Sequence, residues 1–255
     1  PKDYYDYRKD INYNDARLSN YAPFVMYLSH LLNNVATIHY HNHFTPLDLA
    51  LKTNINKLNI ADTLIKNKTV KNTILNNIAF TYLLEDQNMV NNQKFLETYH
   101  KYSTDRSKKN EILKIGNAIQ LLKVGSALPK VELVDRNNQL ISSDDFTKKK
   151  TVIFLWTDNL SSHMLAAHKK ILALKAKYPD YQFIGINLDK DQKLWKAQLE
   201  KYRFNDITEL RCTNFEDLKA NWAIMKVHRT LILDENGLIK NAFTNLFDVH
   251  FEKEL

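Results

Sequence analysis

The chain is poor in the residues that build several common kinds of functional site. Its 255 residues include 4 glycines, 5 prolines and a single cysteine, Cys212. So few glycines argue against the glycine-rich loops that bind phosphate groups. One cysteine allows neither an intrachain disulfide nor a zinc site built from several cysteines. We interpret Cys212 as a small apolar side chain that fills space in a strand, rather than as a reactive thiol.

Long apolar runs and blocks of like charge are also missing. No apolar run approaches the roughly 18 residues that a membrane-spanning helix needs. The formal net charge of +7 is spread along the chain without five consecutive like charges, which indicates a solvated surface, and we expect no nucleic-acid partner. The chain begins at Pro1, so we expect it to be a processed piece whose signal segment or lipid anchor lies outside it.

Apolar residues spaced three and four apart predict five amphipathic helices in the first 120 or so residues. The predicted helices cover Phe24–Ile38, a second helix that opens at Thr45-Pro46, a third after Thr69, a fourth that holds Phe95–Tyr99, and a fifth from Asp105 to Leu122. Each is short and is followed by a polar break, so the pattern predicts an all-α helical domain over residues 1–123.

Three alternating histidines, His39, His41 and His43, stand just before Pro46. On a strand they would share one face and could bind a metal ion. On a helix, side chains two residues apart point in nearly opposite directions and do not converge. The flanking pattern favours the end of a helix, so we predict no metal site there.

The pattern of the chain changes after Val124-Gly125-Ser126 to alternating strands and helices. The predicted order is β-β-β-α-β-α-β-α-β-β-α, which indicates a mixed central sheet flanked by helices over residues 124–255. The predicted strands are Lys130–Val134, Gln139–Ile141, Thr151–Trp156, Tyr181–Asn187, Glu209–Cys212, Thr230–Leu233 and Leu238–Phe243, and a helix is predicted from about Leu246 to Glu252.

Four blocks of this half resemble one known family. They are Val124–Pro129 as the opening segment, Asp135–Phe146 as the first hairpin, Phe154-Leu155-Trp156 as the active-site strand, and Leu231–Ile239 as the late hairpin. Together they resemble the thioredoxin fold, and within it the bacterial envelope thiol-disulfide oxidoreductases and thioredoxin-like lipoproteins. The resemblance implies an α/β thioredoxin-like domain preceded by the all-α helical domain, in the bacterial periplasm or associated with the outer membrane.

The chain departs from this family at both parts of the redox site. The family pattern Phe-Trp-Ala-Ser-Trp-Cys-x-x-Cys would place its two cysteines at Leu160 and His163. Thiol-disulfide exchange needs an activated thiolate and a second thiol, so this chemistry does not carry over. The family's cis-proline corresponds to Arg229, where we expect a trans peptide bond and a reshaped loop.

What remains is a strand that runs into the N-terminus of a helix, a place that attracts anions. We predict that Ser161 or Asn159 caps this helix, and we assign no catalytic residue, because the adjacent side chains of Ser162 and His163 diverge on a helix. If the family topology holds, the candidate binding residues are Trp156, Asp158, Asn159, Ser161, Ser162 and His163, with His228 and Arg229 across the cleft.

Three functions follow as hypotheses. The first is a redox-inactive thioredoxin-like protein that binds protein partners as a scaffold component of a bacterial cell envelope and needs no cofactor. The alternative is a diverged thiol-disulfide oxidoreductase or peroxidase-like enzyme that uses Cys212 with an external thiol. A nucleic-acid-binding module is supported by the net charge alone. We favour the first, because both cysteines and the cis-proline of the family site are missing together.

Overall fold

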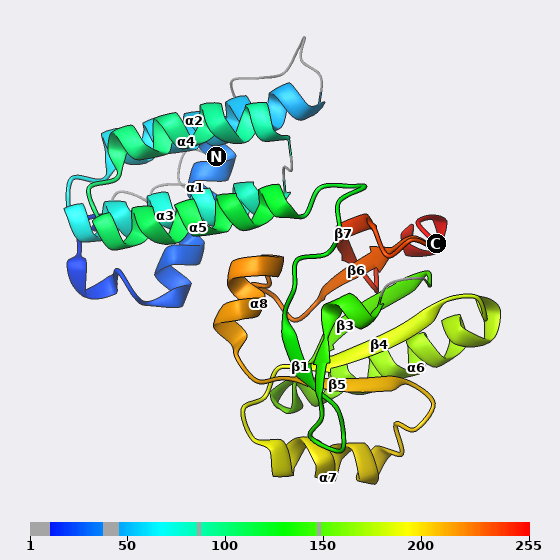
Figure 1. Ribbon diagram of the computed structural model, residues 1–255. Coiled ribbons are helices and arrows are strands. Elements are labelled where there is room, and N and C mark those ends of the chain that lie inside the picture. The colour runs from blue at the N-terminus through cyan, green and yellow to red at the C-terminus, as the bar shows by residue number, and fades with distance from the viewer. Residues whose placement is uncertain (1–10, 38–45, 86–87, 147–148) are drawn as a thin grey trace. The chain divides into compact units, whose positions relative to one another are not determined.

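The computed structural model describes residues 11–37, 46–85, 88–146 and 149–255 (Figure 1). The three histidines between 39 and 43 lie outside these ranges. The chain divides into two compact units, residues 1–116 and 117–255. We propose a domain boundary slightly later, at 123/124, because the helix that crosses the division continues to Leu121. The first backbone bonds to the sheet follow at once, with Gly125 N–H donating to the Ile239 carbonyl at 2.8 Å.

The first unit is helical, as the apolar spacing predicts. A short 3-10 helix, Ala16–Leu18, precedes the five helices α1 (Ala22–Thr37), α2 (Pro46–Leu64), α3 (Lys68–Glu85), α4 (Met89–Tyr102) and α5 (Arg106–Leu121). Several helices begin at a polar cap. The Asn88 side chain accepts hydrogen bonds from the first backbone N–H groups of α4, and the Asp105 carboxylate accepts one from Lys108 N–H at 3.1 Å.

Apolar faces of α1 to α4 meet in the core of this unit. The Tyr82 ring of α3 contacts the Phe95 ring of α4, with centroids 4.3 Å apart. Buried Asn72 fastens α3 to the turn after α4, because its amide oxygen accepts from Thr104 N–H at 2.8 Å and its amide nitrogen donates to the Thr104 hydroxyl at 2.9 Å. An asparagine inside α3 therefore supplies the hydrogen bonds of the turn that follows α4.

The second unit contains a seven-stranded mixed sheet. Its strands are β1 (Glu132–Val134), β2 (Leu140–Ser142), β3 (Thr151–Trp156), β4 (Gln182–Asn187), β5 (Thr208–Cys212), β6 (Arg229–Leu233) and β7 (Ile239–Asn245). Their order across the sheet is β2-β1-β5-β4-β3-β6-β7. The strands β3, β4 and β5 are parallel to one another, and the others join the sheet as antiparallel neighbours.

Helices α6 (Ser161–Lys177), α7 (Gln192–Tyr202) and α8 (Phe215–Trp222) connect the strands. Every residue of β3 is buried, as the continuous apolar run predicts for a central strand. One core cluster joins Phe154 and Trp156 of β3 to Met164 of α6, Trp195 of α7 and Phe251 near the C-terminus. A 3-10 helix, Ser143–Phe146, follows β2.

The prediction of a helix from Leu246 to Glu252 is wrong. The chain instead makes turns, and only Phe251–Lys253 forms a 3-10 helix. The side chain of Asn245 accepts from Phe247 N–H at 2.9 Å, and that of Asp248 accepts from His250 N–H at 2.7 Å. These short-range bonds offer the backbone an alternative to helical bonding.

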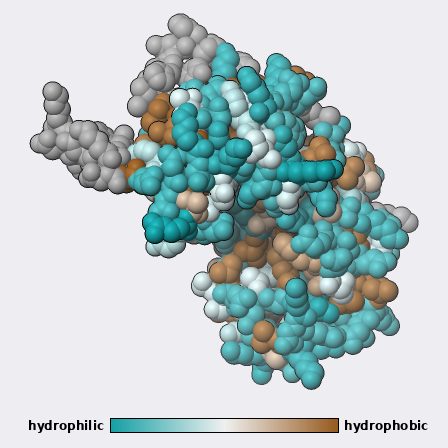
Figure 2. All heavy atoms as spheres, turned by 90° about the vertical axis from the view of Figure 1, so that its left-hand side faces the viewer, coloured by the Kyte–Doolittle hydropathy of each residue, from teal (hydrophilic) through white to brown (hydrophobic). Residues whose placement is uncertain are grey.

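Among the described residues, every helix is too short or too polar to cross a bilayer. Figure 2 shows the corresponding surface character on one face, where hydrophilic side chains dominate and hydrophobic ones are interspersed. The residues that stand out as exposed and apolar include Leu160, Phe247 and Val249 of the second unit, and the first two of these belong to the site described next.

Candidate binding site

The strand-to-helix connection after β3 is built as the sequence predicts, with one additional turn. Trp156 ends β3, Asp158–Leu160 forms a 3-10 turn, and α6 begins at Ser161. Asp189, which follows β4, holds this turn in place. Its carboxylate accepts from the Thr157 hydroxyl and, at 2.7 Å, from Asp158 N–H. Two neighbouring strand ends therefore fix the position of the helix N-terminus.

The N-terminus of α6 has no side-chain cap. Leu160 occupies the N-cap position and makes no capping hydrogen bond. The prediction that Ser161 or Asn159 caps the helix is wrong, because the additional 3-10 turn places Asn159 before the cap and Ser161 inside the first helical turn. Asn159, Ser161 and Ser162 are all exposed. The first N–H groups of α6 therefore have no side-chain acceptor at the cap.

Three separate segments meet at His163. Its ring lies 4.4 Å from the ring of His228, centroid to centroid, at an interplanar angle of 80°. The Phe247 ring, after β7, lies 5.6 Å from it. His163 is half-buried while His228 is exposed. Burial lowers the pKa of His163, and the positive charges that His228 and His168 can carry lower it further.

Trp156 and Arg229 face the interior. The indole Nε1 of Trp156 donates to Glu209 Oε2 at 2.9 Å. The Arg229 guanidinium donates to the carbonyls of Ala242 and Ala223 at 2.6 and 2.9 Å, lies 4.2 Å from the Phe243 ring, and has its pKa lowered to about 10 by burial. All described peptide bonds are trans, including those on either side of Arg229. Both side chains thus form hydrogen bonds inside the fold, and neither is available to a ligand at the surface.

The other six candidate residues lie at or near the surface, together with two exposed apolar side chains. Leu160 is 43% exposed and Phe247 is 41% exposed. We use the name α6 entrance for the group formed by Asp158, Asn159, Leu160, Ser161, Ser162, His163, His228 and Phe247. The group combines apolar contact area, two imidazoles and a helix start without a side-chain cap.

A buried polar cluster lies behind this entrance, and the sequence does not predict it. The Glu209 carboxylate accepts from Trp156 Nε1 and contacts His168 Nε2 at 3.1 Å. His168 Nδ1 lies 2.7 Å from the Met164 carbonyl, so Nδ1 must carry a proton. The contact between Nε2 and the carboxylate then needs a second proton, on His168 or on Glu209. Burial raises the pKa of Glu209, which favours retaining that proton.

The sequence carries one weak signal for this cluster. His168 and Glu209 are 41 residues apart, so no local spacing relates them. Gly185, however, interrupts the apolar strand β4, and a glycine inside a strand often marks a close approach by another group. A Cβ atom at this position would lie 2.6 and 2.7 Å from the two Glu209 carboxylate oxygens. The glycine leaves the space that the buried acid occupies.

Cys212 lies at the end of β5, where its backbone pairs with Leu133 of β1. The residue is 5% exposed, and burial raises the pKa of its thiol to about 11. At neutral pH very little of such a thiol is the reactive thiolate. This environment agrees with the interpretation of Cys212 as an apolar filler.

The topology of the second unit decides its fold. The parallel unit β3-α6-β4 is followed by the antiparallel hairpin β6-β7 on the other side of β3, which gives the core order β4-β3-β6-β7. The second unit has the thioredoxin fold. Its strand-to-helix junction, where thioredoxin-fold oxidoreductases carry two cysteines, is the α6 entrance. The strands β1 and β2 extend the thioredoxin-fold sheet beyond β5.

No family model matches the chain, and no curated protein is detectably similar in sequence. Among solved structures, a Bacteroides vulgatus protein described as a thiol-disulfide oxidoreductase is 24% identical over 52% of this chain and 94% of its own, with a TM-score of 0.47. A C-terminal domain from Bacteroides thetaiotaomicron, described likewise, is 21% identical over 52% and 93%, with a TM-score of 0.43. At this identity the likeness concerns the fold.

Proposed function

We propose that the chain is a redox-inactive thioredoxin-like protein that serves as a binding or scaffold component of a bacterial cell envelope. The observation that carries the proposal is the pair of side chains at the α6 entrance. Leu160 and His163 stand where the redox pattern requires two cysteines, and the one thiol of the chain is buried in β5. Without two accessible thiols, the chain alone has no route for dithiol-disulfide exchange.

The binding surface in this proposal is the α6 entrance, and its partner is a protein. Support comes from the exposed apolar side chains of Leu160 and Phe247, which give contact area. The uncapped first turn of α6 supplies N–H donors beside them. In the proposal the helical first unit contributes further partner contacts, and no cofactor is needed. The envelope location rests on the family resemblance of the second unit.

The redox part of the proposal is tested by an insulin-reduction assay with dithiothreitol as the electron donor. We expect the wild-type protein to leave the rate at that of dithiothreitol alone, and Cys212→Ser to behave in the same way. An acceleration that disappears in the Cys212→Ser variant would establish the alternative, a single-cysteine oxidoreductase with an external thiol. The raised pKa of Cys212 argues against that result.

The binding part is tested by site-specific photocrosslinking in intact bacterial cells. A photoreactive amino acid at Asn159 should give a discrete crosslinked adduct with one envelope protein, whereas the same group at exposed Glu200 of α7 should not. The substitution Leu160→Asp should abolish the adduct, because it places a charge in the apolar part of the entrance. Equal adducts from both positions, or an adduct that survives Leu160→Asp, would rule out the α6 entrance as the binding surface.

A further inference from the structure

Strand β5 is paired along only part of its outer edge. On the side away from β4, its residues Arg211 and Cys212 pair with β1. β1 ends at Val134 and the chain then turns back through residues 135–139, with Asp135 N–H donating to the Gln139 carbonyl at 3.0 Å. Within the described chain, Thr208–Leu210 therefore has no strand partner on this side. An unpaired edge of this kind is a template for another strand.

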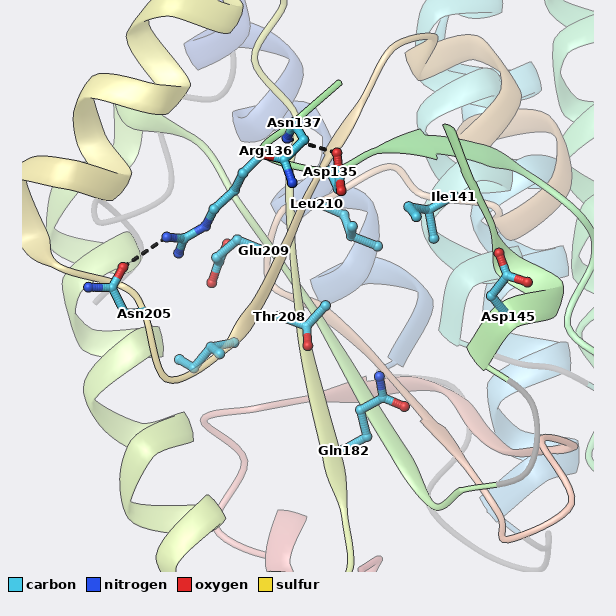
Figure 3. A pocket seen from close by; sticks show the side chains of 11 residues that line it. Asp135, Arg136, Asn137, Ile141, Asp145, Gln182, Asn205, Thr208, Glu209 and Leu210 are labelled. Carbon is cyan, nitrogen blue, oxygen red and sulfur yellow. Dashed lines mark hydrogen bonds between the residues drawn. The ribbon is translucent and has the colours of Figure 1, made fainter. Parts of the chain in front are cut away.

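A pocket of about 480 Å³ lies along this unpaired edge (Figure 3). Thr208, Glu209 and Leu210 all line it. Successive side chains of a strand point to opposite faces of the sheet, and the Glu209 side chain is fully buried. The three residues can line one pocket together only if the pocket exposes their backbone. The pocket therefore opens onto the backbone edge of β5.

Side chains on both sides of the strand form the walls of the pocket. In Figure 3, Arg136 and Asn205 lie on one side of β5, and Ile141 and Asp145 lie on the other. The first wall is fixed, because the Arg136 guanidinium donates to Asn205 Oδ1 at 2.8 Å and to the Phe204 carbonyl. The guanidinium of Arg136 therefore has neutral hydrogen-bond acceptors, and it lines the pocket beside the unpaired edge.

Two carboxylates and the Arg136 guanidinium carry the charge in the pocket. Asp135 and Asp145 both line it, and neither forms an ion pair with any described lysine or arginine. The Asp135 carboxylate is occupied by the turn, where it accepts from Asn137 and Gln139 N–H at 2.8 Å. Exposed Asp145 is the freer carboxylate, since it accepts one backbone bond, from Ser142 N–H at 3.1 Å. A cationic side chain would complement it.

We propose that this pocket binds an extended polypeptide segment that carries lysine or arginine. The segment pairs antiparallel with Thr208–Leu210, along the line that β1 would follow if it continued. The three open residues offer about 10 Å of edge. A basic side chain of the segment reaches Asp145, while its backbone supplies the hydrogen bonds. This site is separate from the α6 entrance, so a partner can engage both surfaces or either one.

The test uses the full chain labelled with nitrogen-15 and three acetylated, amidated pentapeptides. The first alternates valine and lysine, the second has glutamate in place of lysine, and the third is the lysine peptide with every backbone nitrogen methylated. We expect the lysine peptide to shift the amide resonances of residues 207–210 and 135–137 saturably. The methylated peptide should not, because neither edge of its backbone can pair with β5. Shifts that persist on methylation, or none at these residues at millimolar peptide, would overturn the proposal.

Two neighbouring acids give a matched pair of variants. Asp145→Asn should remove the preference for the lysine peptide over the glutamate peptide, a loss of about two- to fivefold, the scale of an exposed ion pair. Asp144→Asn, next to the pocket but not lining it, should keep the preference. Leu160→Asp should leave peptide binding unchanged, which separates this site from the proposed function of the α6 entrance. Equal effects of the two aspartate substitutions would contradict the assigned role of Asp145.

Discussion

Gly185 and Glu209 face each other on the paired strands β4 and β5, and each depends on the other. The buried carboxylate satisfies Trp156 and His168, and it fits only because Gly185 has no side chain. A Cβ atom at Gly185 would also lie 2.8 Å from the Phe154 ring. Contacts under 3.0 Å between such atoms force the surroundings to move. The packing around Trp156 therefore depends on having glycine at position 185.

Alanine substitutions at two glycines should change stability in opposite directions. Gly185→Ala should lower the free energy of unfolding by about 1–3 kcal/mol, the usual cost of overpacking a core. Gly116→Ala in α5 should raise it by up to about 1 kcal/mol, because alanine favours helices and the nearest atom, Leu96 Cδ1, is 3.6 Å away. Urea unfolding of both variants measures the two effects. A harmless Gly185→Ala would mean that Glu209 can move aside.

The buried cluster predicts that residue shape and hydrogen bonding matter more than charge at Glu209. Glu209→Gln can still accept from Trp156 and donate to His168, so we expect it to cost less than about 1.5 kcal/mol. Glu209→Ala leaves both partners unsatisfied and should cost about 3–5 kcal/mol. Urea unfolding followed by tryptophan fluorescence compares the two. A glutamine variant as unstable as the alanine variant would show that the cluster needs a carboxylate.

His163 predicts a pH dependence of stability. Folding lowers its pKa, so at mildly acidic pH the unfolded chain binds more protons at this residue than the folded chain does. Stability is therefore lost as pH falls below the ordinary histidine value of about 6.5 towards the lower value of the folded state. The urea midpoint should fall less between pH 7.5 and pH 5 in His163→Gln than in the wild type. Exposed His250→Gln, as the control, should follow the wild type.

At the scale of the elements, α6 and α7 start in different ways. α7 has Asp191 at its N-cap, whose carboxylate accepts from Lys193 and Leu194 N–H at 2.8 and 3.1 Å. α6 has Leu160, without a capping bond. A helix start without a cap forgoes about 1 kcal/mol. The N-cap position of α6 instead carries the exposed apolar side chain of Leu160, which is consistent with the binding surface that we propose.

Substitutions at these two N-cap positions should have opposite effects on stability. Leu160→Asp should raise the free energy of unfolding by about 0.5–1 kcal/mol, while Asp191→Ala should lower it by about 0.5–2 kcal/mol. Thermal or urea unfolding measures both. If Leu160→Asp destabilises the fold, the Leu160 side chain contributes to packing, and the loss of the Asn159 adduct in this variant could no longer be assigned to binding alone.

Periodicity predicts most elements, but not the ones that depend on exact local geometry. The five helices and the seven strands follow from the spacing of apolar residues, because a buried face must repeat with the period of its element. The cap of α6 could not be predicted, since it depends on one additional 3-10 turn before Ser161. The prediction of the last helix failed because the side chains of Asn245 and Asp248 accept hydrogen bonds from backbone N–H groups two residues further along the chain.

The candidate site was less predictable than the fold. Sequence places His228 near the α6 entrance only through the resemblance, and the structure brings it to His163. The family resemblance placed Arg229 and Trp156 at the cleft, yet both side chains are buried. The cluster of His168 and Glu209 joins residues 41 positions apart, and the pocket beside β5 depends on where β1 stops. Such relations arise from tertiary structure and leave no local pattern.

At the scale of the whole molecule, the second unit contains its own core. The cluster around Trp156, Trp195 and Phe251 draws all its members from residues 152–251. We therefore expect residues 124–255, expressed alone, to fold and to unfold cooperatively in urea. Far-ultraviolet circular dichroism and amide dispersion in NMR spectra check this. A fragment that lacks a cooperative transition would show that the helical unit is needed for folding.

The single thiol of the chain can serve as a probe of local opening in the sheet. Cys212 lies where β1 pairs with β5, and a thiol-labelling reagent can reach its buried side chain only when the structure around it opens. The rate of labelling under native conditions then reports how often this edge opens, without any introduced probe. A peptide that completes the edge of β5 should slow the labelling, and one that binds only the α6 entrance should leave it unchanged.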